Sequence, residues 1–247
     1  MSVKVLKQGI VQASGDTINP NLLKNTLFTQ QYTQSSGWNT TKNGTILASN
    51  WGGYNSGVPN ASTVYHAHLK WFGGEWVYEY IRTADESWLG ISQGFSGTAG
   101  IITANTTYTA SFDQWLTSGC NNYITVGIYH KQTSDGSANF HAGCTNGTGE
   151  SIVGRWCRRY FTFTITSFYT GYNPALYIYG HMGTGNCQGT IYMRRPKLEK
   201  GSVATPWCPH ADEGYNITNH GFVETSEYKD AVKLHKNYIE VKELIEI

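Results

Sequence analysis

The chain has 247 residues and a formal net charge of +1, and 14% of its residues are charged, against roughly 25% in an average globular protein. A net charge this close to zero gives no basis for nucleic acid or an anionic membrane as a partner. No apolar run approaches the roughly 18 residues of a membrane-spanning helix, and the first residues lack the apolar core of a secretion signal. Aromatic residues make up 14% of the chain and there are 28 glycines, which favours strands and tight turns over helices.

Charge is distributed unevenly along the chain. Residues 1–210 hold 14 basic and 9 acidic side chains, a net +5, whereas residues 211–247 hold 4 and 8, a net −4. This change predicts a boundary near His210. We therefore expect three parts: an N-terminal arm over 1–18, a folded domain over 19–210, and a linker with an attachment or oligomerisation segment over 211–247.

Short strands separated by Gly- and Asn-rich turns run through the middle part. Period-2 alternation predicts strands over 45–48, 63–72, 75–82, 108–117, 122–130, 156–166, 174–180 and 189–195. The polar stretch 133–149 reads as a long connection. Pro196 has no backbone donor, so pairing of the last strand should loosen there or lie on an edge. Many short strands at this spacing predict an all-β sandwich.

Four segments, in chain order, resemble one family. They read NLLKNTLF from Asn21, YTASF from Tyr108, RWCRRYFTFT from Arg155 and PKLEKGSVATPW from Pro196. Together they resemble the jelly-roll modules, related to family 4/9-type carbohydrate-binding modules, of bacteriophage virion proteins. The resemblance spans residues 21–207 and implies a jelly-roll β-sandwich whose first and last strands meet, with Trp207 buried against the base of the sandwich.

The same resemblance implies a function. It suggests a structural subunit of a phage tail or fibre, placed in the virion after synthesis in the host cytoplasm, that adheres to host-surface glycans and is not an enzyme. Two alternatives stay open. One is a purely architectural head-fibre or capsid-decoration protein, and the other is a polysaccharide depolymerase.

Aromatic residues are concentrated between residues 51 and 88, with Trp115 following later. Sugar rings pack their flat C–H faces on aromatic rings, so such a region suits glycan binding. The alternative is that the rings fill the core or an interface. The predicted glycan-binding residues are Trp51, Tyr54, Trp71, Trp76, Tyr78 and Trp115.

Neither a cofactor nor a metal is expected. The five cysteines include no CxxC pair, so a zinc ribbon is not indicated, and His66 and His68 read as an ordinary strand pair. Arg194 and Arg195 stand where relatives of the resembled family often carry Asp, so a structural calcium is not expected. The acids near the predicted sheets read as solvated surface rather than as a glycosidase pair: Glu75, Glu79, Asp85, Glu86 and Asp113.

The last 21 residues carry an apolar face on a short element. Such an element is not stable alone, so we predict a homo-oligomer, and the resemblance implies a trimer attached to other virion proteins. Val232–Val241 also echoes Val3–Gln12, either by chance or as two copies of an assembly strand. The predicted assembly residues are Leu234, Tyr238, Val241, Leu244 and Ile245.

Overall fold

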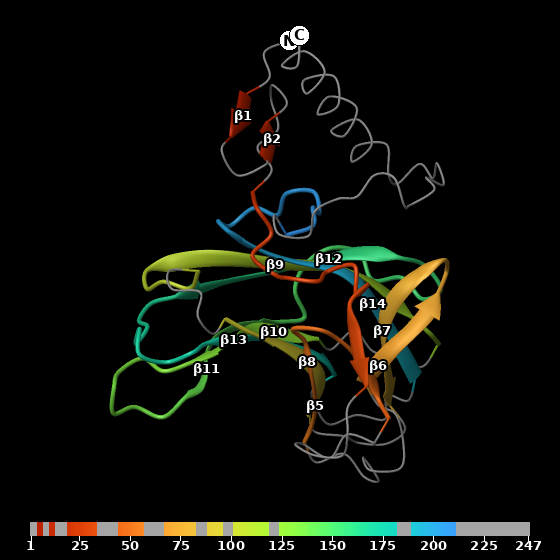
Figure 1. Ribbon diagram of the computed structural model, residues 1–247, viewed down its shortest axis with the longest axis horizontal. Helices are drawn as coiled ribbons and strands as arrows, with labels where there is room; N and C mark the ends of the chain where they lie inside the picture. The colour runs from red at the N-terminus through yellow and green to blue at the C-terminus, as the bar shows by residue number, and fades with distance from the viewer. Residues whose placement is uncertain are drawn as a thin grey trace.

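The computed structural model describes residues 4–6, 10–12, 19–33, 44–56, 67–82, 88–95, 101–118, 124–181 and 189–210. Two five-stranded antiparallel sheets make up most of this part (Figure 1). The β10 sheet has the strand order β11-β10-β13-β8-β5, and its strands are β5 (Gly52–Ser56), β8 (Trp88–Gly94), β10 (Thr125–His130), β11 (Asn139–Thr145) and β13 (Ala175–His181). The β9 sheet has the order β12-β9-β14-β7-β6, and its strands are β6 (Ala67–Phe72), β7 (Glu75–Arg82), β9 (Thr106–Leu116), β12 (Cys157–Ile165) and β14 (Gly189–Lys200).

The chain winds between the two sheets as it does in a jelly roll. After the β6–β7 hairpin, which lies in the β9 sheet, the chain crosses repeatedly between the two sheets. Strands β8, β10, β11 and β13 lie in the β10 sheet, and the strands that come between and after them, β9, β12 and β14, lie in the β9 sheet. The predicted all-β jelly-roll sandwich is therefore confirmed. None of the described segments forms a helix long and apolar enough to cross a membrane.

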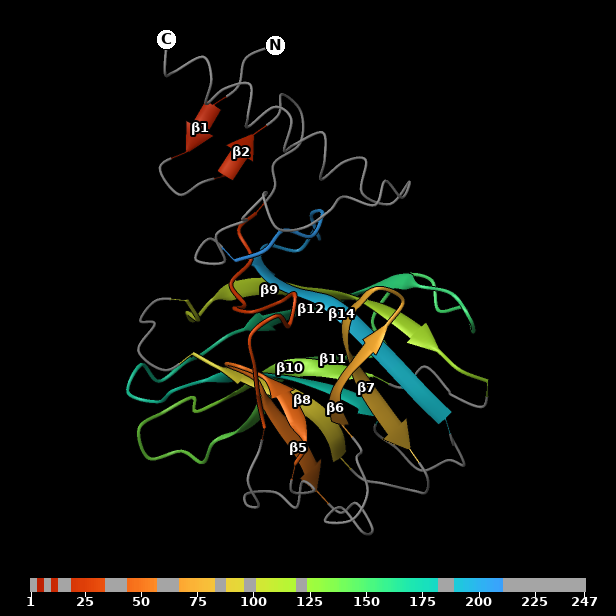
Figure 2. The same ribbon diagram turned by 45° about the vertical axis from the view of Figure 1, so that its right-hand side comes forward.

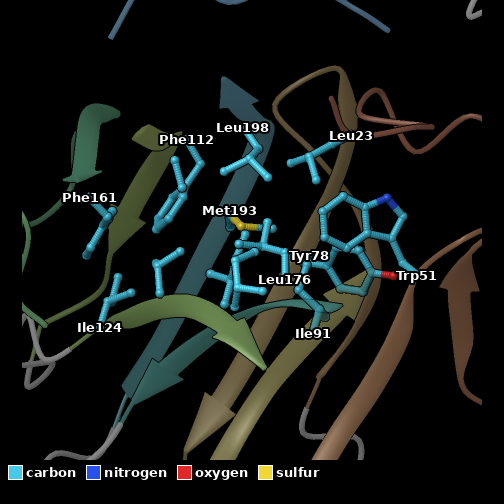
Figure 3. Close-up of a cluster of buried hydrophobic side chains, with 14 of the residues drawn as sticks. Leu23, Trp51, Tyr78, Ile91, Phe112, Ile124, Phe161, Leu176, Met193 and Leu198 are labelled. Carbon is cyan, nitrogen blue, oxygen red and sulfur yellow. The ribbon is translucent and has the colours of Figure 1, made fainter. Parts of the chain in front are cut away.

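The core lies between the inner faces of the sheets (Figure 3). Along β12 the odd-numbered residues from Cys157 to Ile165 are buried, while Thr162 and Thr164 are exposed. This is the period-2 pattern of a strand with one buried face. The β9 sheet contributes Phe112 and Phe161, and the β10 sheet contributes Leu176. Each such side chain stabilises the fold by about 1.5–3 kcal/mol when fully buried.

The polar stretch 133–149 contains a strand, so its reading as one long connection was wrong. Strand β11 reads NFHAGCT, and of its side chains Ala142 alone is buried. Phe140, Ala142 and Cys144 do alternate in this strand, but the small and polar residues between and around them hide so short a pattern. Glycines explain why β5 and β8, which contain Gly52, Gly53, Gly90 and Gly94, were not predicted, because glycine is depleted in strands.

Strand β14 is irregular at Pro196, as predicted. Its register against β9 shifts between Arg194 and Lys197, and Arg195 has a φ of 51° in the left-handed region. Its pairing with β7 ends at Met193. Pro196 therefore lies in a bulge against β9, beyond the last residue of β14 that pairs with β7.

The chain segments at the two ends of the domain meet beside β14, the last strand, although the first of these segments is not itself a strand. Leu22 N donates to Leu198 O at 2.9 Å. The Asn21 amide donates to Pro196 O at 3.1 Å and to Cys208 O at 3.0 Å. Figure 2 shows residues 19–30 and 201–210 at the same end of the sandwich. Trp207 is half-buried here, so the predicted burial is only partial.

Two small ribbons complete the described elements. β1 (Lys4–Leu6) pairs with β2 (Ile10–Gln12), and β3 (Gln31–Thr33) pairs with β4 (Ile46–Ala48). The division at residues 18 and 210 stays a prediction. The predicted assembly residues lie outside the described residues: Leu234, Tyr238, Val241, Leu244 and Ile245.

Candidate functional site

The outer face of the β10 sheet carries neighbouring aromatic residues. In β10, Val126 and Ile128 point into the core, so Gly127 and Tyr129 take the opposite face by strand alternation. Cross-strand partners share a face, which places three rungs of residues on this outer side. The first rung is Thr145, Thr125, Tyr179, Gly90 and Tyr54, the second is Gly143, Gly127, Tyr177, Ser92 and Gly52, and the third is Phe140, Tyr129, Ala175 and Gly94.

Four rings on these rungs form one patch, which we name the tyrosine face: Tyr129, Phe140, Tyr177 and Tyr179. Tyr177 and Tyr179 have ring centroids 5.5 Å apart with an interplanar angle of 20°. The ring centroid of Phe140 lies 5.9 Å from that of Tyr177 and 5.5 Å from that of Tyr179. Tyr129 lies 5.8 Å from Tyr177 and 6.4 Å from Phe140. The four rings therefore touch one another from three different strands.

Glycines under the rings let them lie close to the sheet. A Cβ atom at Gly127 would be 2.6 Å from the Phe140 ring, and one at Gly90 would be 3.0 Å from the Tyr179 ring. Neither glycine has a positive φ among those described, so the backbone conformation does not require glycine at these positions. At both positions the atom nearest to such a Cβ is a backbone carbonyl oxygen at 2.4 Å, with a ring next to it, so the close approach of neighbouring backbone and rings leaves room only for glycine.

The rings differ in exposure. Tyr129, Phe140 and Tyr177 are half-buried, whereas Tyr179 is only 4% exposed. The first three can contact a bound molecule, and Tyr179 supports them from below.

Two predicted ligand-binding residues, Trp51 and Tyr78, are core residues instead. They are 1% and 0% exposed and lie in the core (Figure 3), and both rings pack edge-on against Phe28. Trp51 Nε1 donates to Lys24 O at 2.9 Å, and Tyr78 Oη accepts from Ala48 N at 3.0 Å. Their polar atoms are thus satisfied by the backbone, and neither side chain can reach a ligand from the core. Here the alternative of core filling is correct.

The other four predicted residues do not form one site, although Trp71 and Trp76 contact each other. Trp71 is 58% exposed next to the Gly73–Gly74 turn and packs edge-on against Trp76 at 5.4 Å. Trp76 is half-buried and packs against the core. Tyr54 pairs with Gly90 in the first rung, although its side chain lies outside the described part. Trp115 lies on the outer face of the opposite sheet.

That opposite face, on the β9 sheet, carries a second aromatic group, which we name the tryptophan cluster: Phe72, Trp115, Trp156 and Tyr192. Phe72 stacks on Tyr192 at 4.3 Å, and Trp115 packs edge-on against Trp156 at 5.7 Å. The Arg194 guanidinium lies 4.0 Å from the centre of the Trp156 ring. Ring faces in this cluster are therefore partly covered by each other and by a cation.

Ion pairs surround the tryptophan cluster. Glu79 bonds to His68 Nε2 at 2.9 Å and to Lys70 Nζ at 2.7 Å. Burial by itself raises the pKa of the Glu79 carboxyl, but the hydrogen bonds from His68 and Lys70 outweigh burial and lower that pKa to about 2. Asp113 bonds to Arg158 Nη1 at 3.0 Å. The described acids in the sheets are thus held in ion pairs rather than solvated as predicted.

Within the described part, no three His, Cys, Asp or Glu side chains gather in a way that could hold a metal ion. Asp85 and Glu86 lie outside it. Glu75 belongs to the same network of ion pairs, since Arg194 and Arg195 both bond to its Oε1.

Sequence reasoning missed the tyrosine face. A usable signal was present in 174–180, where Tyr177 and Tyr179 alternate with Leu176 and Ile178, because the face opposite the aliphatic residues must point outward. No comparable signal marks Phe140, because its alternation with Ala142 predicts the buried face, and only the register shift opposite Ile128 and Tyr129 turns it outward.

No protein-family model matches the sequence, and no curated protein matches it. Among solved structures, a family 4 carbohydrate-binding module is 15% identical, covers 72% of this chain and 99% of its own, and has a TM-score of 0.43. The xylan-binding CBM22-1 domain of Paenibacillus barcinonensis Xyn10C is 10% identical, covers 77% and 100%, and has a TM-score of 0.43. A Stig cyclase of Fischerella sp. TAU is 14% identical, covers 76% and 100%, and has a TM-score of 0.48.

Proposed function

We propose that the chain is a glycan-binding module whose ligand lies on the tyrosine face. The observation that supports this proposal is the contiguous patch of half-buried rings on a glycine floor. Tyr129, Phe140 and Tyr177 offer flat apolar surface together with the tyrosine hydroxyls, which donate and accept hydrogen bonds. The C–H faces of sugars pack on such rings while sugar hydroxyls bond to polar tips.

The tryptophan cluster is a weaker candidate for the same role. Phe72 and Tyr192 cover each other, Arg194 covers Trp156, and neighbouring carboxylates already hold the cations. A ligand would have to displace these contacts before it could reach the faces of these rings.

Binding to a glycan array and titration calorimetry test this proposal. Tyr177→Ala and Tyr129→Ala should each weaken glycan binding at least about tenfold, as expected for aromatic anchors. Trp71→Ala is the matched control, because it removes a more exposed ring that lies outside the face. Equal binding by wild type and Tyr177→Ala, or equal loss in Trp71→Ala, contradicts the proposal.

We further propose that the module is displayed on a phage virion appendage, such as a tail or fibre, and is held there by residues 211–247. The resemblance over residues 21–207 and the meeting of both ends of the domain support this role. Antibody labelling of intact particles tests it, because the label should decorate an appendage. Absence of the protein from purified particles would rule it out. Labelled particles combined with no glycan binding would favour the architectural alternative.

A further inference from the structure

Strands β9 and β14 stay aligned up to the point where β9 leaves the sheet. Leu116, the last residue of β9, lies opposite Ile191 of β14. One residue further, Thr117 N donates to Thr190 O at 3.0 Å, and Thr190 N donates to Thr117 Oγ1 at 2.8 Å. The described residues therefore fix the register with which the two chains run past this end of the sandwich.

The same register leads to two cysteines. Cys120 follows Thr117 by three residues, and Cys187 precedes Thr190 by three residues. In an antiparallel pair, each step forward on one strand is matched by a step backward on the other. Both cysteines lie outside the described residues, and the register of their described neighbours relates them. Continued over three steps, that register would bring Cys120 opposite Cys187.

The spacing of antiparallel strands suits a disulfide at this position. Hydrogen-bonded and non-hydrogen-bonded pairs alternate along such a ladder, and Thr117 with Thr190 is of the hydrogen-bonded kind. The pair three steps further is then non-hydrogen-bonded, with Cα atoms about 4.5 Å apart. A disulfide needs Cα atoms about 4.4–6.8 Å apart. The backbone turns at Ser118, so the bond requires only that the two chains stay within this range, not a regular ladder.

The fold supplies an independent reason for the two chains to stay close. The connection from β9 to β10 contains Cys120, and the connection from β13 to β14 contains Cys187. Strands β9 and β14 pair in one sheet, and strands β10 and β13 pair in the other, where Thr125 lies opposite Tyr179. Both connections therefore begin and end on neighbouring strands as they cross from sheet to sheet.

The remaining cysteines leave these two as the available pair. Cys144, Cys157 and Cys208 carry free thiols within the described part of the chain, and the sequence has five cysteines in all. We propose that Cys120 and Cys187 form a disulfide that joins the two connections and braces the end of the sandwich where β14 begins. This inference goes beyond the proposed function and does not depend on glycan binding.

Formation of the bond needs an oxidant, and a low-molecular-weight disulfide such as glutathione disulfide supplies the chemistry. The thiolate of one cysteine attacks a sulfur of the oxidant and releases one glutathione thiolate. The thiolate of the other cysteine then attacks the cysteine sulfur of this mixed disulfide and releases the second glutathione. The two protein thiols lose two protons and two electrons, which the two glutathione thiols carry away. Because a reducing cytosol keeps thiols reduced, the bond should form after the protein leaves it.

Peptide mapping of the full-length protein tests the pairing directly. The protein is incubated with glutathione disulfide, denatured, alkylated with iodoacetamide without reduction, digested and analysed by mass spectrometry. We expect a peptide that contains Cys120 linked to one that contains Cys187, with alkylation at Cys144, Cys157 and Cys208. Alkylation at all five cysteines, or a bond from Cys120 or Cys187 to a different cysteine, overturns the proposal.

Thermal unfolding tests whether the bond braces the fold. A disulfide that closes so long a loop should raise the thermal midpoint, so dithiothreitol should lower the midpoint of the oxidised protein by about 10 °C. Cys120→Ser and Cys187→Ser should each abolish this response, and the double variant should match either single variant. Cys144→Ser is the matched control and should keep the response. A linked peptide together with an unchanged midpoint contradicts the brace, and loss of the response in Cys144→Ser contradicts the assigned pair.

Discussion

Lys197 and Glu199 lie two residues apart on β14, both completely buried, and they hold the hydroxyl of Thr205 between them. Lys197 Nζ donates to Thr205 Oγ1, which donates to Glu199 Oε2 at 2.6 Å, and Thr205 N donates to Glu199 Oε1 at 2.9 Å. Lys197 Nζ also lies 3.4 Å from Glu199 Oε2, so the two side chains form an ion pair. The closing segment is thus fixed by charge-assisted hydrogen bonds inside the protein.

Thr205→Val should destabilise the domain, because it keeps the shape of the side chain but removes both hydroxyl bonds to buried charges. We expect a loss of about 2–4 kcal/mol in the free energy of unfolding, measured by urea denaturation. Val203→Thr is the control, since Val203 lies in the same segment and is 72% exposed. If the urea midpoint of Thr205→Val equals that of wild type, the hydroxyl of Thr205 does not stabilise the buried charges of Lys197 and Glu199.

The free energy of unfolding should fall at acidic pH, because the carboxylate of Glu79 becomes protonated. The pKa of this carboxyl is lowered to about 2 in the folded protein, against 4.5 for an unperturbed glutamate. A carboxyl whose folded pKa is lowered stabilises the fold above its unfolded pKa and loses that contribution as the pH falls from about 4.5 to about 2. The contribution is about 3 kcal/mol at neutral pH. Glu79→Gln should flatten the pH dependence in this window, and an unchanged slope would contradict the assignment.

Trp51 and Trp71 should behave oppositely when replaced by alanine. Trp51 is 1% exposed in the core and Trp71 is 58% exposed. Trp51→Ala should cost about 3–5 kcal/mol in the free energy of unfolding, and Trp71→Ala less than about 1 kcal/mol. Urea denaturation followed by circular dichroism measures both. Similar losses in the two variants would contradict the burial described here.

Calcium and chelators should leave the thermal midpoint unchanged. Glu75 and Asp113 have their negative charge matched by Arg158, Arg194 and Arg195, so guanidinium groups occupy the positions around both carboxylates. A cation that bound only the folded state would raise the midpoint. If added calcium raised the thermal midpoint and EDTA reversed the rise, the protein would have a calcium site away from these arginines.

The segment after the domain should control the oligomeric state. A chain ending at Ala211 should be a folded monomer, while the full chain should be an oligomer, because the apolar residues of 227–247 need cover. Light scattering on both chains measures this. A full-length monomer at about micromolar concentration would exclude self-assembly and leave attachment to another protein as the role of this segment.

Most strands were predictable because their apolar residues alternate, as Phe161, Phe163 and Ile165 do in β12. The register and pairing of the strands were not predictable, because they depend on contacts between residues that are far apart in the sequence. For the same reason the sequence could not separate Trp51 and Tyr78, which are core, from Trp71, which is exposed. The tyrosine face depends on three strands meeting over glycines, and only the paired register brings Phe140 to Tyr177 and Tyr179.

The closeness of the two domain ends has a practical consequence. Asn19 N donates to Thr205 Oγ1 at 3.2 Å, and Cys208 Sγ donates to Asn19 O at 3.6 Å, so the polypeptide enters and leaves the sandwich at one point. A host protein with a surface loop could therefore accept residues 19–208 as an insert, because the two junctions would need only a narrow gap in the host backbone. Residues 19–208 can therefore be inserted into a loop of another protein without distorting the backbone of either protein.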